Sequence, residues 1–191
     1  EEYVWRLVNS LVGQGTKVKV VCERCEAEVP NGVSVGFVPR SLRGPRWFRS
    51  HGFSNQLKKW RDRYLRSNDI IHSHEFIDQA DLLTFHTTIH GYGESSWLKR
   101  MDPSWHLNQS LEKKTVYSPR LKFLIPVSDM LRNQLDDNYR GIKSVLSSAI
   151  PPGVIMPKCQ MRSANDLRPH VLGFMGREWE RKGLKLVIKI F

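Results

Sequence analysis

The fold class of this chain is decided by the stretch Gly173-Phe174-Met175-Gly176-Arg177-Glu178-Trp179-Glu180-Arg181-Lys182-Gly183. A short apolar run over residues 171–175 leads into it and predicts a buried strand. The residues that follow have an apolar i, i+3, i+4, i+7 spacing, which predicts an amphipathic helix and is carried by Leu184, Val187, Ile188 and Phe191. A strand, a glycine turn and a helix in this order indicate an α/β architecture.

The same stretch favours phosphate chemistry. A helix start presents free N–H groups and the positive end of the helix dipole, and both attract phosphate. Arg177 and Lys182 would add two full charges beside those N–H groups. A leaving nucleotide diphosphate gains negative charge, so fixed cations would stabilise it. Taken alone, the stretch is equally compatible with a surface loop whose charges are solvated.

Composition narrows the class of protein. The chain has 191 residues, 40% hydrophobic content and a formal net charge of +11, which fits a globular protein of one to one and a half domains with an anionic partner. No apolar run reaches the ~18 residues of a membrane span, and the start resembles no signal peptide. Three cysteines argue against a disulfide framework and for a reducing compartment.

The first forty residues predict a helix and two strands. An apolar stripe over residues 1–11 indicates the helix, and residues 17–22 and 33–38 read as strands. Cys22 and Cys25 form a C-x-x-C pair at the end of the first strand. One pair provides too few ligands for structural zinc, and a turn follows where a redox pair needs a helix. We interpret the pair as a chance spacing at a strand end.

A basic block follows. Residues 40–66 contain nine Lys or Arg residues and only one acidic residue, Asp62. Five aromatic residues are interleaved with them: Trp47, Phe48, Phe53, Trp60 and Tyr64. Residues 54–65 are expected to be helical, because their apolar positions share one face. Such a block fits an anionic lipid surface, a nucleic acid, or a solvated helix whose aromatic side chains pack inward.

Further strands are predicted over residues 69–76 and 121–128, and residues 82–93 are read as a strand with its exit turn. His72, His74 and Glu75 near the first strand end raise the possibility of a metal site. On a strand, however, the two histidines share a face and Glu75 points away, so no complete ligand set results. Ser128 is expected to cap a helix over residues 129–136.

Five motifs in this order resemble those of the retaining glycosyltransferases of family four, which have the GT-B fold, and most closely the bacterial enzymes that build the lipopolysaccharide core. They are Asp69-Ile70-Ile71-His72-Ser73-His74, His90-Gly91, the strand ending in Ser128, the Pro151-Pro152-Gly153 hinge, and Gly176-Arg177 followed by Lys182-Gly183. The resemblance implies an α/β fold, with a Rossmann-like parallel sheet and flanking helices over residues 1–153. Residues 154–191 would be a connector and the truncated start of a second, donor-binding Rossmann-like domain. The family's first strand, with its glycine-rich loop, is not seen here.

The resemblance also implies a reaction. A hexose would pass from a UDP- or GDP-sugar to a hydroxyl of a membrane-associated glycan or glycolipid, with retention at the anomeric carbon. His90 would lie at the transferred sugar, and the alternative for His90 is a turn or core histidine bonded to the backbone. Arg177 and Lys182 would hold the diphosphate, so the family needs no metal. The basic, aromatic residues over 97–122 would seat the enzyme on the anionic inner membrane face, which implies a cytoplasmic, peripheral protein.

Two alternatives come from other classes of protein. The basic block could bind nucleic acid by stacking bases on aromatic rings between cations. Against this, the chain contains no RNP, KH or zinc-finger pattern, so no nucleic-acid partner is expected. A membrane-binding module without catalysis is the other alternative.

Overall fold

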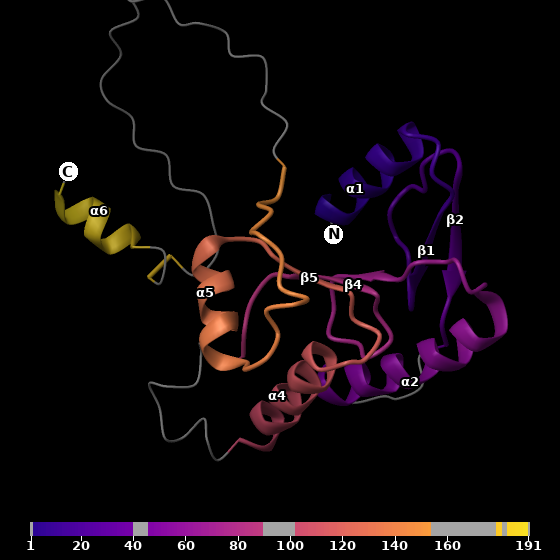
Figure 1. Cartoon of the computed structure of the whole chain (residues 1–191). Coiled ribbons are helices and arrows are strands. Elements are labelled where there is room, and N and C mark those ends of the chain that lie inside the picture. The colour runs from indigo at the N-terminus through magenta and orange to yellow at the C-terminus, as the bar shows by residue number, and fades with distance from the viewer. Residues whose placement is uncertain (1, 40–45, 90–101, 154–178, 181–182, 191) are drawn as a thin grey trace, which may run out of the picture. The chain divides into compact units, whose positions relative to one another are not determined.

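The structure is a computed structural model that describes residues 2–39, 46–89, 102–153, 179–180 and 183–190. The chain divides into two compact units, residues 1–153 and 154–191, and each is described by itself. Figure 1 shows the elements in chain order. The first unit contains α1 (Glu2–Gly13), β1 (Val18–Cys22), β2 (Val33–Phe37), α2 (Arg46–Tyr64), β3 (His72–Ser73), β4 (Leu82–Phe85), α4 (Pro103–Val116), β5 (Phe123–Pro126) and α5 (Asp129–Asn138). In the second unit the described helix is α6 (Leu184–Ile190).

All strand pairs of the described residues are parallel, which confirms the predicted α/β class. β1 pairs with β2 in the register Val18 to Val33. β4 pairs with β3 on one side and with β5 on the other. The sequence predicted one sheet, whereas the described residues form a two-stranded and a three-stranded sheet.

The third strand is shorter than expected because a side chain replaces part of its ladder. Only His72 and Ser73 pair as a strand, although residues 69–76 were predicted. Just before them, the N–H of Ile71 donates to the carboxylate of Asp81 at 3.0 Å. The carbonyl of Ile71 accepts from the N–H groups of Asp81 and Leu82. The two strands are therefore joined at their start by a carboxylate as well as by backbone hydrogen bonds.

Two helices differ from the sequence prediction. Helix α2 begins at residue 46, earlier than the expected residue 54. Helix α4 was not predicted at all, although its start carries clear signals. Asp102 accepts a hydrogen bond from the N–H of Ser104 at 2.8 Å, and Pro103 occupies the first helical position, where its missing N–H costs nothing.

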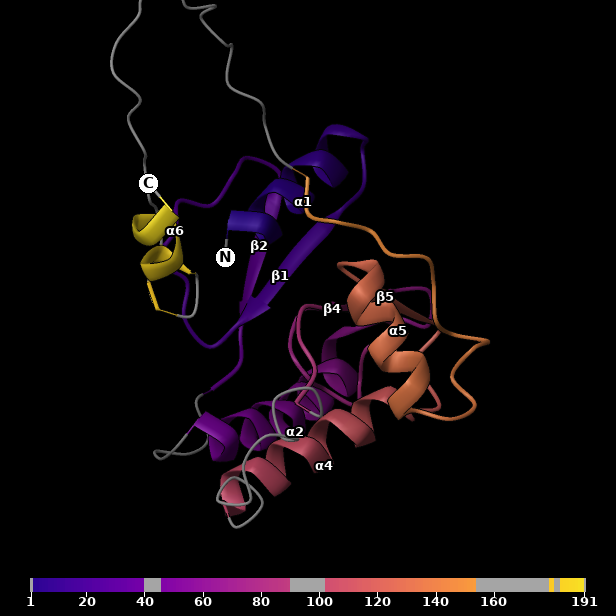
Figure 2. The ribbon, with the colours of Figure 1, turned by 90° about the vertical axis from the view of Figure 1, so that its left-hand side faces the viewer.

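Side chains from strands and helices form two hydrophobic clusters. In both Figure 1 and Figure 2, α2 and α4 run side by side below the strands, whereas α1 lies away from that pair. The larger cluster joins β4, β5, α4 and α5, with Phe85, Leu124 and Leu135 fully buried. The smaller cluster is formed by Val38, Leu57, Ile77 and Ala80.

The described aromatic residues of α2 face both inward and outward. Phe53 and Trp60 pack against the smaller cluster. Gly36 of β2 makes room for Trp60, since a Cβ atom there would lie 3.0 Å from its Cζ2 atom. Tyr64 is exposed, with the Arg63 guanidinium over its ring. Phe53 and Trp60 are therefore partly buried, and their packing against the cluster limits their availability for stacking on bases or inserting into lipid. No helix of the described residues is long and apolar enough to cross a bilayer.

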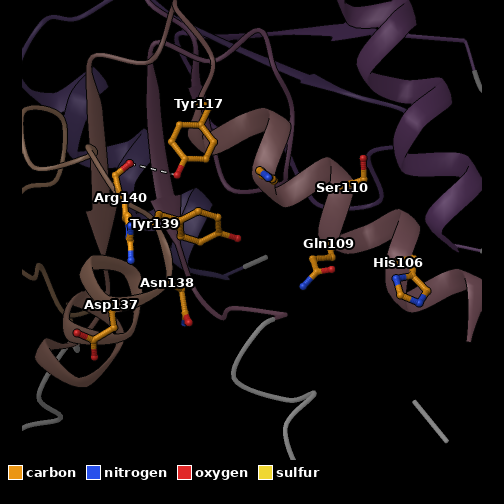
Figure 3. Close-up of a pocket in the computed structure, with 9 residues that line it drawn as sticks. His106, Gln109, Ser110, Tyr117, Asp137, Asn138, Tyr139 and Arg140 are labelled. Atoms are coloured by element: carbon orange, nitrogen blue, oxygen red, sulfur yellow. Dashed lines mark hydrogen bonds between the residues drawn. The ribbon is translucent and has the colours of Figure 1, made fainter. Parts of the chain in front are cut away.

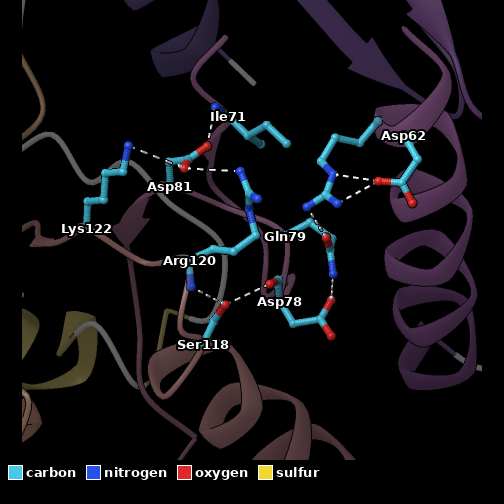
Figure 4. Close-up of polar contacts among 9 residues, drawn as sticks. Asp62, Ile71, Asp78, Gln79, Asp81, Ser118, Arg120 and Lys122 are labelled. Atoms are coloured by element: carbon cyan, nitrogen blue, oxygen red, sulfur yellow. Dashed lines mark hydrogen bonds and ion pairs between the residues drawn. The ribbon is translucent and has the colours of Figure 1, made fainter. Parts of the chain in front are cut away.

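A polar network ties α2, α4 and the amino end of β4 together, and Figure 4 shows the part of it around Asp78, Gln79 and Asp81. The carboxylate of Asp78 accepts from Ser54 of α2 and pairs with Lys114 of α4, both at 2.8 Å. Burial alone would raise the pKa of Asp78, but the hydrogen bonds from Lys114, Gln79 and Ser54 outweigh it and lower the pKa to about 2. Because this network lies before the strands begin, its role is to hold the scaffold.

Candidate functional site at the carboxyl ends of the strands

Three histidines gather where β3 and β4 end. The Nε2 atom of His72 lies 2.7 Å from the hydroxyl oxygen of Thr84, and Nδ1 of His74 lies 3.1 Å from Nε2 of His86. The rings of His72 and His74 stack with centroids 4.8 Å apart, which confirms the prediction that the two residues share a face. Tyr3 of α1 presents its ring edge-on to His74 and His86.

The environment keeps these imidazoles neutral. Burial lowers the pKa of His74 to about 4, with a further contribution from its neighbours His72 and His86. Burial also lowers the pKa of His72 and of His86. A neutral imidazole both donates and accepts a hydrogen bond, so the cluster offers polar, uncharged groups at the edge of the sheet.

A small pocket opens beside the cluster, at the exits of β4 and β5. Its volume is about 200 Å³, and its wall contains His86, Thr87, Thr88, Ser128, Met130, Leu131 and Gln134. Ser128 also caps α5, because its hydroxyl accepts from the N–H of Leu131 at 3.2 Å, as the sequence predicted. Complete ligand sites usually have about 300–1,000 Å³. The pocket therefore has room for only part of a larger ligand.

A buried carboxylate holds the chain as it leaves β4. Glu112 of α4 is fully buried, and its carboxylate accepts from the Thr88 hydroxyl at 2.8 Å, the Ile89 N–H at 2.7 Å and the Tyr139 hydroxyl at 2.6 Å. Burial and the neighbouring carboxylate raise the pKa of Tyr139, which keeps its hydroxyl a donor. These contacts fix the two residues that directly precede His90.

A larger depression of about 550 Å³ lies between α4 and the end of α5 (Figure 3). The Tyr117 hydroxyl donates to the Arg140 carbonyl at its rim. None of the residues that line this depression lies at the carboxyl end of a strand. They belong to α4, to the end of α5 and to the residues just after these helices: His106, Gln109, Ser110, Lys113, Tyr117, Asp137, Asn138, Tyr139 and Arg140. In open parallel sheets ligands bind beyond the carboxyl ends of the strands. We therefore place the candidate site at the smaller pocket.

The predicted site residues His90, Arg177 and Lys182 lie outside the described residues. The stretch around His90 is described as far as Ile89, which the Glu112 carboxylate holds. The strand expected over residues 171–175 also lies outside the described residues, whereas the predicted helix after it is present as α6. The roles of His90, Arg177 and Lys182 stay predictions.

Metal and thiol chemistry gain no support from the described part of the chain. Within it, no group of three or more His, Cys, Asp or Glu side chains could hold a metal ion. Cys22 and Cys25 are free thiols, and burial raises the pKa of Cys22. A raised pKa disfavours the thiolate that redox or metal chemistry requires.

Sequence reasoning missed Thr84, His86 and Glu112. Thr84 and His86 could have been found, because they alternate along one strand in the same way as His72 and His74. Glu112 carried a weaker signal, a lone acid beside the buried positions Leu111 and Val116.

Comparisons with known proteins agree with this architecture. The family model described as Glycosyltransferase Family 4 matches residues 1–156. Among solved structures, the chain is similar to the one titled "Crystal Structure of WaaG, a glycosyltransferase involved in lipopolysaccharide biosynthesis", with a TM-score of 0.66 and 13% sequence identity. That match covers 76% of this chain and 40% of the other, so the chain corresponds to only part of that protein. No curated protein sequence matches.

Proposed function

The chain belongs to glycosyltransferase family 4, and from this membership we propose that its protein transfers a hexose from a nucleotide diphosphate sugar to a hydroxyl of a membrane-associated glycan or glycolipid, with retention at the anomeric carbon. The family match over residues 1–156 is the observation that carries the proposal. The small pocket at the carboxyl ends of β4 and β5 supports it, because a site for part of a sugar ligand is expected at that edge.

In this proposal the neutral groups at the strand ends contact the sugar. Thr87, Ser128 and Gln134 provide hydroxyl and amide groups in the pocket wall. His90, next along the chain after the fixed Ile89, hydrogen-bonds a hydroxyl of the donor sugar through a neutral imidazole or its backbone carbonyl. Positive charge builds on the sugar ring as the bond to the diphosphate breaks. Uncharged groups suit that place better than cations do.

The charges act on the leaving group instead. Arg177 and Lys182 are proposed to hold the diphosphate of a UDP- or GDP-sugar through their side-chain charges. The N–H groups expected to be free at the start of the following helix do not add to this, because those of Leu184, Leu186 and Val187 donate to backbone carbonyls. Two fixed cations there stabilise the charge that the diphosphate gains on leaving. Under this proposal the reaction needs no metal ion.

We further propose that the protein works on the cytoplasmic face of a membrane that carries anionic lipid. In α2 and directly after it, Lys58, Lys59, Arg63 and Arg66 are exposed. Each cation near an anionic leaflet contributes about 1 kcal/mol. Since Phe53 and Trp60 pack inward, attraction by this region would be electrostatic.

The proposal is tested on the full-length protein with a panel of UDP- and GDP-hexoses and a glycolipid acceptor fraction. We expect one nucleotide sugar to be consumed and a glycolipid product to form. The anomeric proton coupling in that product should match the donor's configuration. His90→Ala should lower turnover by about 10²–10³, as the loss of one preorganised hydrogen bond does, without changing the melting temperature. Absence of transfer from every donor, or a product of inverted configuration, would contradict the proposal.

A further inference from the structure

The depression between α4 and the end of α5 has the size of a complete ligand site. Its volume of about 550 Å³ lies within the range of about 300–1,000 Å³ that is usual for small-molecule sites. Figure 3 shows its two walls, with His106, Gln109 and Ser110 of α4 on one side and Asp137, Asn138 and Arg140 on the other. The depression shares no lining residue with the small pocket at the strand ends, so it is a separate candidate site.

Two cations in this wall have no carboxylate partner among the described residues. Lys113 and Arg140 both line the depression, and neither side chain forms an ion pair there, whereas the next lysine along α4, Lys114, pairs with Asp78. Asp137 is the one carboxylate among the lining residues, so the cations outnumber it. Lysine and arginine side chains only donate hydrogen bonds, and the oxygens of a phosphate or carboxylate group are their matching acceptors. The wall therefore favours an anion.

A tyrosine ring beside these cations offers an apolar face. Tyr117 is 47% exposed, and its hydroxyl donates to the carbonyl of Arg140 at 3.2 Å, which holds the ring in the wall. Its ring also meets that of Tyr139 edge-on, with centroids 5.9 Å apart. A ring held in this way can cover the apolar C–H face of a sugar. The hydroxyl of Ser110 and the amide of Asn138 both donate and accept hydrogen bonds, as sugar hydroxyl groups do.

We propose that this depression binds an anionic saccharide, a sugar that carries a phosphate or carboxylate group. Lys113 and Arg140 hold the anionic group, and the ring of Tyr117 covers the apolar face of the sugar. A neutral sugar lacks the charge and a free phosphate ion lacks the apolar face, so neither of them uses the whole wall. The inference goes beyond the proposed transfer reaction, because this site shares no residue with the strand-end pocket and its occupation needs no catalysis.

Binding by the full-length protein is tested with three probes: glucose 6-phosphate, methyl glucoside and inorganic phosphate. NMR titration observed on the probe is suited to weak binding. We expect glucose 6-phosphate to bind at least about tenfold more tightly than either of the other probes, because only it combines a charge-assisted hydrogen bond with ring contact. Its affinity should fall as salt is added, since exposed charges are screened. Equal affinity for glucose 6-phosphate and inorganic phosphate would overturn the proposal.

Single substitutions locate the binding. Lys113→Gln and Arg140→Gln should each weaken binding of glucose 6-phosphate about tenfold, because each removes a charge-assisted hydrogen bond. Tyr117→Ala should weaken binding of glucose 6-phosphate and leave that of inorganic phosphate unchanged. Lys143→Gln is the matched control, because Lys143 is an exposed cation after α5 that pairs with Asp136 and does not line the depression. It should bind glucose 6-phosphate as the wild type does.

The proposed diphosphate site also offers cations to this probe, so Arg177→Ala is the discriminating variant. We expect Arg177→Ala to retain binding of glucose 6-phosphate. If Arg177→Ala abolishes that binding whereas Lys113→Gln and Arg140→Gln keep it, the probe occupies the donor site and the proposal is overturned. The proposal is also overturned if Lys113→Gln and Arg140→Gln weaken attachment to phosphatidylserine vesicles but not binding of glucose 6-phosphate, because the wall would then be a lipid-binding surface.

Discussion

The Nε2 atom of His72 lies 2.7 Å from the hydroxyl oxygen of Thr84, across two adjacent parallel strands. This hydrogen bond fixes the plane of the His72 ring, and the ring of His74 stacks on it. The strand ends therefore carry an ordered, neutral surface, and its behaviour depends on pH.

Acid should destabilise the protein through these histidines. The folded-state pKa of His74 is about 4, below its usual value of 6.5, so the unfolded state binds more protons between these values. The free energy of unfolding should fall as pH decreases from about 6.5 towards 4. Urea unfolding at a series of pH values measures this. His74→Gln should flatten the dependence, and an unchanged slope would contradict the role of His74.

Asp78 should control stability at lower pH. Its pKa of about 2 lies below the ordinary value of 3.8, so the stabilisation is complete above pH 4 and is lost as pH falls towards 2. Asp78→Asn should cost about 1–2 kcal/mol at pH 7, because Lys114 and Ser54 lose their charged partner. At pH 2 the variant and the wild type should differ little. Chemical unfolding at both pH values tests this, and an equal difference at the two would refute it.

Gly36 should be intolerant of any side chain. An added Cβ would lie 3.0 Å from Cζ2 of Trp60, whose rigid ring packs on the smaller cluster. Gly36→Ala should therefore lower the free energy of unfolding by about 1 kcal/mol or more. Gly13→Ala is the control, because its Cβ meets nothing within 4 Å, and it should be neutral or stabilising. If the two variants unfold alike, the contact does not limit packing.

Loss of the two proposed diphosphate cations should slow the reaction more than it weakens binding. Arg177→Ala or Lys182→Ala in the full-length protein removes a charge-assisted hydrogen bond of about 1.5–3 kcal/mol, so turnover should fall about ten- to a hundredfold. Binding of the nucleotide should weaken less, because the diphosphate charge grows only as the sugar leaves. Steady-state kinetics and calorimetry on both variants separate these quantities, and normal turnover would exclude the role.

Membrane attachment should depend on anionic lipid and on the exposed cations of α2. The protein should bind vesicles that contain phosphatidylserine, bind phosphatidylcholine vesicles far less, and dissociate at high salt. Lys58→Gln/Lys59→Gln should weaken binding about tenfold. Lys143→Gln, in an exposed pair with Asp136, should change binding less. Co-sedimentation with vesicles measures binding of the wild type and of both variants. Equal binding of the wild type to the two lipids would refute the electrostatic mechanism.

Local patterns predicted most of the architecture. The apolar spacing of α1 and the Ser128 cap of α5 gave their positions to within two residues. Helix α4 was missed because its exposed surface is polar and basic, although Asp102-Pro103 marks its start. The hydrogen bonds of Glu112 to Thr88, Ile89 and Tyr139 join residues far apart in sequence, so no local pattern contains them. The stacked histidines were an intermediate case, since alternation predicted their shared face but not their partners Thr84 and Tyr3.

The parallel connectivity has a consequence for folding kinetics. Parallel neighbours cannot be joined by a tight hairpin, and Leu82 of β4 meets Phe123 of β5 only after α4 has crossed between them. The chain must therefore bear the entropic cost of closing long loops before this strand pairing can stabilise it. Domains with such non-local pairings fold more slowly than helical bundles. Until β5 has paired with β4, the edge of β4 can pair with another chain and lead to aggregation. The refolding yield should therefore fall as protein concentration rises.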